Sequence, residues 1–144
     1  MKRSSSMSSV KGSDYVTNYE ELMSEYDGHV TIEERKMKND GLYCDNFIWI
    51  NRDLTERQKA CILAEEIGHY ETTVGDITFR TDLNAEKQEQ NARIWGYKKL
   101  LPPERILYAC AEGYTEPSEI AEYLDVDEAF LVEAVNYYRR KNLL

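Results

Sequence analysis

The segment Ala60–Tyr70 (ACILAEEIGHY) limits the fold more than any other part of the chain, because its pattern fits a helix that is buried along one side. Its apolar positions recur every three or four residues, which is the period of an amphipathic helix. They are Ala60, Leu63, Ile67 and Tyr70. Thr55, followed three residues later by Gln58, is typical of a capping box at the start of a helix. The sequence therefore predicts a central helix that begins near residue 55.

A second face of this helix carries groups that can bind a metal ion. Glu65 and His69 are four residues apart, so they lie on adjacent turns, one above the other. Glu66 directly follows the first of them. Two potential ligands at positions i and i+4, with a carboxylate after the first, form the layout of the metallopeptidase motif His-Glu-x-x-His. In this chain a glutamate, Glu65, stands in place of the first histidine.

Histidine is scarce, since His29 and His69 are the only two in the chain. A zinc site with three histidines from one chain is therefore excluded, and any metal site must rely on carboxylates. Glu89 is the best further candidate, because two antiparallel helices joined by a loop would bring it beside His69. Two plainer interpretations stay open. Glu65 and Glu66 can be a solvated helix face, and His69 can be a half-buried surface histidine.

Before the central helix, the sequence predicts one short helix over residues 14–26 and then three strands. The strand candidates alternate in polarity or are rich in β-branched and aromatic residues. They span residues 29–34, 41–44 and 47–50. Asp45-Asn46 separates the last two and favours the tip of a hairpin. We expect a small sheet, about three-stranded and antiparallel or mixed, packed on the central helix.

After the central helix, residues 72–83 are interpreted as a loop with a turn at Gly75-Asp76, and the rest of the chain is helical. The further helices are expected at residues 84–101, 103–113, 117–124 and 127–141. Asp125 with Glu128 is a capping-box candidate for the last of them. The expected fold class is α+β.

Composition excludes several classes of function. With 42% hydrophobic and 31% charged residues, the 144-residue chain can bury a core. Its net charge of −9 argues against nucleic acid as the main partner, because phosphate binding needs clustered Lys and Arg. The three cysteines (Cys44, Cys61 and Cys110) lack metal-ligand or redox spacing, which suits reduced thiols in a cytoplasmic protein. No apolar run approaches the length of a membrane span, and no secretory signal is recognised.

Three blocks of the sequence are specific when they are taken together. They are GLYCDN with IWIN at residues 41–46 and 48–51, CILAEEIGHY at residues 61–70, and Glu89-x-x-Ala92-x-x-Trp95 ending at Leu101-Pro102. In combination these blocks resemble the ImmA/IrrE family of metallo-endopeptidases, in the short form found on prophages and conjugative elements. The resemblance covers roughly residues 18–140.

The resemblance implies a zincin-like metallopeptidase domain over residues 14–102, followed by the helical extension at 103–144. Residues 1–13 are Ser-rich, basic and without periodicity, which predicts a flexible tail. The resemblance further implies that Glu66 is the general base and that His69 and Glu89 are zinc ligands. Glu65 stands where the family's first zinc histidine would be, and a carboxylate can ligate zinc at about 2.0–2.2 Å. A Glu-His-Glu site is more negative than a His-His-Glu site, which makes the metal a weaker Lewis acid. A site with weak or lost metal binding is therefore the rival interpretation.

The resemblance also implies a partner. We expect a zinc-dependent endopeptidase of a prophage or mobile element that cleaves or inactivates a cognate helix-turn-helix repressor. The alternative is a catalytically degenerate relative that acts as an antirepressor, binding the repressor without cleaving it. In both cases the partner is a protein, and neither nucleic acid nor a membrane is contacted directly.

The acidic C-terminal stretch is the candidate for partner recognition. Residues 114–138 hold seven acidic residues and no Lys or Arg, so a helix-turn-helix in this region would repel DNA. Its aromatic residues are Tyr114, Tyr123, Phe130, Tyr137 and Tyr138. Aromatic anchors with a charged rim suit a protein interface, although a solvated charged face is the plainer interpretation.

Overall fold

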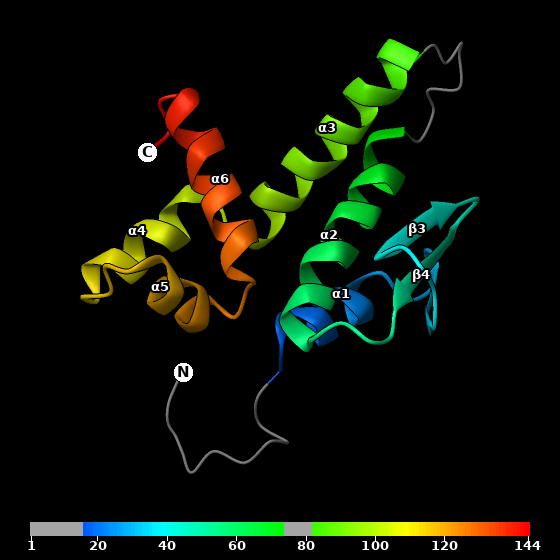
Figure 1. Cartoon of the computed structure of the whole chain (residues 1–144), viewed down its shortest axis with the longest axis horizontal. Helices are drawn as coiled ribbons and strands as arrows, with labels where there is room; N and C mark the ends of the chain where they lie inside the picture. The colour runs from blue at the N-terminus through cyan, green and yellow to red at the C-terminus, as the bar shows by residue number, and fades with distance from the viewer. Residues whose placement is uncertain (1–15, 74–81) are drawn as a thin grey trace.

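The computed structural model describes residues 16–73 and 82–144, which form a small sheet and six helices (Figure 1). The helices are α1 (Asn18–Glu25), α2 (Glu56–Thr73), α3 (Asp82–Leu100), α4 (Pro103–Ala111), α5 (Pro117–Leu124) and α6 (Glu128–Arg140). The strands are β2 (Thr31–Arg35), β3 (Gly41–Cys44) and β4 (Phe47–Asn51). The predicted α+β class is confirmed. The tail at 1–13 and the turn at Gly75-Asp76 lie outside the described residues.

The sheet is mixed, with the strand order β2-β4-β3. The predicted hairpin is confirmed, because β3 and β4 pair antiparallel around Asp45 and Asn46. Both turn residues have positive φ (51° and 70°), as a two-residue type I′ turn requires. The first strand begins at Thr31 rather than at His29, since the amides of His29 and Val30 donate to the carbonyl of Tyr26 in the turn after α1.

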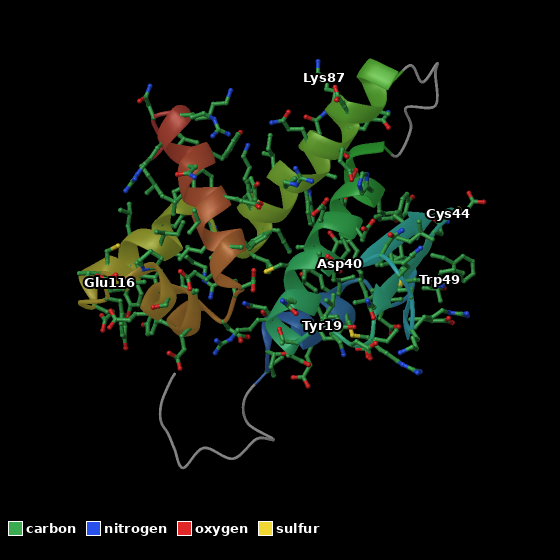
Figure 2. The ribbon with its side chains drawn as sticks, in the orientation of Figure 1. Tyr19, Asp40, Cys44, Trp49, Lys87 and Glu116 are labelled. Atoms are coloured by element: carbon green, nitrogen blue, oxygen red, sulfur yellow. The ribbon has the colours of Figure 1, made fainter. Side chains whose placement is uncertain are left out.

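Helix α2 lies between the sheet and α3, so it forms the centre of the fold (Figure 1). The capping box predicted at its start is present, since Thr55 and Gln58 exchange hydrogen bonds of 3.0 and 3.2 Å. The stripe predicted as buried is confirmed at Ala60, Leu63 and Ile67, and Tyr70 is partly buried. Ile48 and Ile50 are also fully buried. The intervening Trp49 lies with Cys44 on the outer side of the sheet (Figure 2).

Helices α2 and α3 pack unusually closely, because glycine and alanine line their crossing. A Cβ added to Gly68 of α2 would overlap the carbonyl oxygen of Ala92 and lie 3.0 Å from the Cα of Ala92. At the next contact, Gly96 of α3 faces Ala64, and there an added Cβ would have ordinary contacts of 3.5 Å. The closest approach of the two backbones is therefore at Gly68.

The C-terminal helices complete the same buried core. The hydroxyl of Tyr138 donates to the carbonyl of Leu101 at 2.7 Å, and Phe130 and Tyr137 are buried as well. These three aromatic residues therefore serve packing, and they are not available as interface anchors. The division into segments 14–102 and 103–144 stays a prediction. Within the described residues, no helix is both long enough and apolar enough to cross a lipid bilayer.

The capping box predicted at Asp125 and Glu128 is wrong. Asp125 ends α5 in the left-handed conformation (φ 62°), and the N-cap of α6 is Asp127. Tertiary contacts hold Asp125 in this place, because its carboxylate accepts a hydrogen bond from the backbone amide of Asn18 and pairs with Arg57 at 3.2 Å.

Candidate metal centre

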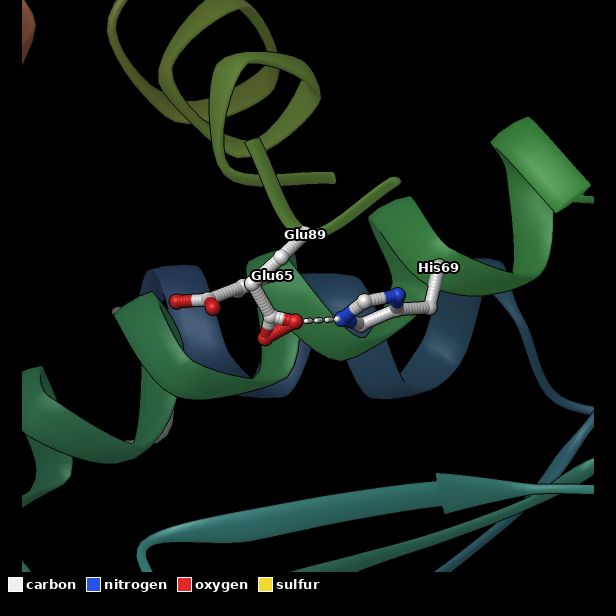
Figure 3. A group of neighbouring side chains, drawn as sticks. All are labelled: Glu65, His69 and Glu89. Carbon is white, nitrogen blue, oxygen red and sulfur yellow. Dashed lines mark ion pairs between the residues drawn. The ribbon is translucent and has the colours of Figure 1, made fainter. Parts of the chain in front are cut away.

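Three side chains from two helices converge on one point of the surface. Glu65 and His69 lie on successive turns of α2, and Glu89 reaches them from α3. Each offers one ligand atom, and these atoms lie within 4.8 Å of one another. Figure 3 shows the carboxylate of Glu89 turned toward the imidazole, with His69 Nε2 and Glu89 Oε1 3.0 Å apart. The structure thus brings together all three residues that the sequence proposed as ligands; their role as ligands stays a prediction.

The close helix crossing explains this convergence. Gly68 directly precedes His69, and Ala92 lies three residues after Glu89 on α3. Because neither residue has a side chain beyond Cβ, the backbone of α3 comes near enough for Glu89 to contact the imidazole. The site therefore depends on the small residues at the crossing as well as on the polar residues themselves.

The donor set fits a zinc ion. Zinc takes oxygen and nitrogen ligands at about 2.0–2.2 Å, so two ligand atoms on one ion are separated by at most about 4.4 Å. The pair of His69 and Glu89, at 3.0 Å, already meets this limit, and the most distant pair, within 4.8 Å, would close to the roughly 3.4 Å that a tetrahedral zinc sets between its ligands. The side chain of Glu89 is half-exposed, so the group is open to solvent on one side. A catalytic zinc needs such an opening for water and substrate.

Glu66 lies on the side of α2 that faces the sheet, apart from the three grouped residues. A Cβ added to Gly41, at the start of β3, would lie 3.0 Å from Oε2 of Glu66. Burial raises the pKa of Glu66, and together with the nearby charges of Glu65 and Glu89 it brings this pKa to about 8. Burial also raises the pKa of Glu65, against the opposing effect of Arg93. The carboxylates thus destabilise one another's charge, and a bound cation would relieve this repulsion.

Three neighbours of the grouped residues were not assigned to the metal site from the sequence. Arg93 Nη2 lies 3.6 Å from Glu65 Oε2. The ring of Tyr43 is stacked on that of His69, with centroids 6.3 Å apart and planes 7° apart, and Gly41 lies against Glu66. The sequence could have identified one of them, Arg93. It follows Glu89 by four residues, which places both on one face of α3. The two β3 residues became neighbours of the site only through sheet packing.

Comparison with known protein families agrees with this geometry. A family model described as the IrrE N-terminal-like domain, a peptidase family, matches residues 13–136, a range that contains the whole candidate site. No curated protein matches the chain. The resemblance to the ImmA/IrrE family is thereby confirmed, and the chain belongs to the metallopeptidase-like family of the IrrE N-terminal-like domain.

Proposed function

We propose that this protein is a zinc-dependent endopeptidase whose metal ion is held by Glu65, His69 and Glu89. One observation carries the proposal: a histidine and two carboxylates from two separate helices converge near a further, partly buried glutamate, Glu66. Membership of a metallopeptidase-like family supports the same reaction class. The arrangement assigns different tasks to the adjacent residues Glu65 and Glu66, because they leave α2 in different directions.

Each residue has a defined part in this proposal. Zinc would polarise the scissile carbonyl and make water a better nucleophile near neutral pH. Glu66 would accept the proton of the attacking water and pass it to the leaving amine. The stacked ring of Tyr43 would hold the imidazole of His69 in one orientation. The backbone of Gly41 closes the space on the other side of Glu66.

The substrate is proposed to bind as an extended strand along β3. In the order β2-β4-β3, β3 has one paired edge and one edge that no described strand covers. Residues Gly41 and Tyr43 of this strand lie against Glu66 and His69. A peptide that adds to the open edge through backbone hydrogen bonds would therefore run directly past both groups.

Metal analysis tests the proposal before any substrate is known. Protein purified without chelator is expected to hold about one zinc ion per chain by elemental analysis, since the three ligands form one site. His69→Ala and Glu89→Gln are expected to weaken zinc binding by about 100-fold or more, because even outer-sphere partners cost 10- to 100-fold. Glu86→Gln is the matched control, because Glu86 is an exposed carboxylate on α3 outside the grouped residues. Equal zinc content in all four proteins would refute the site.

The protein substrate is proposed to be a basic helix-turn-helix repressor, as the family resemblance implies, and the far end of the molecule offers a surface for it. Leu107, Tyr108 and Tyr123 are 55%, 59% and 41% exposed on α4 and α5, and the ring of Tyr123 packs against that of Tyr114 in a tilted arrangement with centroids 4.7 Å apart. The surrounding acidic residues are Glu112, Glu116, Glu119 and Glu122. We refer to these eight residues as the acidic tyrosine surface.

The charge of this surface favours a basic partner. Residues 106–138 contain no Lys or Arg, and the four glutamates have no ion pair within the described part of the chain. Aromatic side chains within an acidic rim suit a protein interface, and the acidic rim would also speed encounter with a basic protein. The surface lies at the opposite end of the molecule from the sheet (Figure 1), and Glu116 marks this end in Figure 2. Recognition and cleavage would thus use two separate regions.

Binding measurements with the repressor encoded beside this gene test the acidic tyrosine surface. Tyr108→Ala is expected to raise Kd about tenfold, as loss of an aromatic anchor does. The double variant Glu119→Lys, Glu122→Lys is expected to raise Kd and to remove most of its salt dependence. Glu21→Lys on α1 is the control, because it reverses an exposed charge elsewhere. Wild-type affinity in all three variants would place recognition nearer β3.

We also propose a second function, because Glu65 would bring a negative charge to the position of the first motif histidine, whose imidazole is neutral. An antirepressor that binds the same repressor without cleaving it would use the acidic tyrosine surface alone. One measurement distinguishes the two functions. It is whether the repressor is still intact after incubation with zinc-loaded protein. An intact repressor in a stable complex favours the antirepressor.

A further inference from the structure

The most specific unassigned feature of the site is the guanidinium of Arg93. It lies on the same face of α3 as Glu89, and its Nη2 is 3.6 Å from Oε2 of Glu65. The side chain of Glu65 is 20% exposed, whereas that of Arg93 is 45% exposed, so the cation approaches the carboxylate from the solvent side. Figure 3 shows the carboxylate of Glu65 turned away from the imidazole, whereas that of Glu89 is turned toward it.

The charges at the site explain why such a neighbour matters. Three carboxylates interact electrostatically at the site, because Glu65 and Glu89 are grouped with His69 and both raise the pKa of the nearby Glu66. A divalent cation would neutralise two of them and leave an excess negative charge, which makes the metal a weaker Lewis acid. The guanidinium of Arg93 supplies a positive charge beside the Glu65 carboxylate. Glu65 paired with Arg93 has no net charge, as a neutral imidazole has none.

We propose that Arg93 and Glu65 form one neutral unit that takes the place of the first motif histidine, with Arg93 competing with the metal for the carboxylate. This inference rests on the proposed metal site. In this arrangement Arg93 is a positioning residue, because it contacts a ligand rather than the reacting atoms. The competition lowers the zinc affinity of the site, and the added positive charge offsets the electron donation of the extra carboxylate.

Competition makes a prediction that simple repulsion does not. A bare positive charge near the site would weaken zinc binding by a similar factor whatever residue stands at position 65. A guanidinium that holds the Glu65 carboxylate would lose most of its effect when that carboxylate is absent. The effect of Arg93 on zinc affinity should therefore depend on Glu65, which a double-mutant cycle measures directly.

The experiment compares the zinc affinities of the wild-type protein, Arg93→Gln, Glu65→His and the double variant by competition with a chromogenic chelator. Arg93→Gln is expected to tighten zinc binding about tenfold in the Glu65 background. In the Glu65→His background it is expected to change the affinity less than about threefold, because imidazole does not pair with a guanidinium. Lys87→Gln is the control, because it removes an exposed cation of α3 outside the grouped residues. It should change the zinc affinity in neither background.

Each other outcome overturns the inference. Equal effects of Arg93→Gln in the two backgrounds would mean that Arg93 acts only as a distant charge. Weaker zinc binding in Arg93→Gln would mean that it holds Glu65 in place for the metal instead of competing with it. Absence of zinc binding in all four proteins would instead overturn the proposed metal site, and this result is distinguishable because it includes the wild type.

Discussion

Gly68→Ala is expected to separate α2 from α3 and to disrupt the candidate metal centre. The added Cβ would overlap the carbonyl oxygen of Ala92 and lie 3.0 Å from its Cα. Backbone atoms cannot rotate out of the way as a side chain can, so the helices must move apart. Overpacking of this kind costs about 1–3 kcal/mol and sometimes more, which exceeds the gain of about 1 kcal/mol in helix propensity from Gly to Ala.

A displacement of the helices at Gly68 would also affect the candidate metal centre, because His69 directly follows Gly68. Moving α3 away carries Glu89 out of its 3.0 Å contact with the imidazole. We therefore expect Gly68→Ala to lower the free energy of unfolding by about 1 kcal/mol or more and to weaken zinc binding about 100-fold, as removal of Glu89 itself would. Urea unfolding and chelator competition measure the two effects.

Gly96→Ala is the matched control at the same crossing. Its Cβ would meet Ala64 at 3.5 Å, an ordinary contact, so the helix-propensity gain should not be opposed. We expect unchanged zinc affinity and a free energy of unfolding equal to or up to about 1 kcal/mol above that of the wild type. If Gly68→Ala were as stable and as tight in zinc binding as Gly96→Ala, the crossing would not set the geometry of the site.

Local patterns were enough to predict much of this fold, because the features concerned are encoded by neighbouring residues. Asp45-Asn46 determines the hairpin by its tolerance of positive φ, and Thr55 with Gln58 determines the start of α2. The candidate site was predictable for a similar reason. Residues at i and i+4 of one helix share a face, and Glu89 lies on the next helix along the chain, which a loop folds back beside the first.

Features that depend on distant contacts were not predictable from local patterns. The parallel pairing of β2 with β4 places β3 at the edge, and alternation along a strand does not reveal its neighbours. Asp125 has the residue type of an N-cap, yet its contacts with Asn18 and Arg57 stabilise it as the end of α5. Composition likewise cannot distinguish the buried Tyr138 from the exposed Tyr123, because only the packing of α6 on the core separates them.

Glu66→Gln is expected to stabilise the metal-free protein. The pKa of Glu66 is raised from 4.5 to about 8, so folding favours its protonated form. The stability that this group contributes is fully present below pH 4.5 and is lost as the pH rises to about 8. Glutamine is neutral throughout, so the variant should exceed the wild type by on the order of 3 kcal/mol at pH 7, with no difference near pH 4. Urea unfolding at both pH values, in the presence of a chelator, measures this difference in the free energy of unfolding. Glu86→Gln is the control, and it should change the free energy of unfolding little.

The same substitution should abolish hydrolysis while leaving the metal in place. Glu66 lies toward Gly41 and outside the group formed by Glu65, His69 and Glu89, so the variant should keep the zinc affinity of the wild type within a few-fold. An amide cannot accept the proton of the attacking water, and loss of a general base lowers the rate by about 10²- to 10⁴-fold. Cleavage of the cognate repressor by zinc-loaded protein measures that loss.

A variant that is more stable, still binds zinc and cannot cleave would show that Glu66 is kept for catalysis at the expense of stability. A variant that cleaves at the wild-type rate would remove Glu66 from the mechanism, and one that loses zinc would make it a ligand instead.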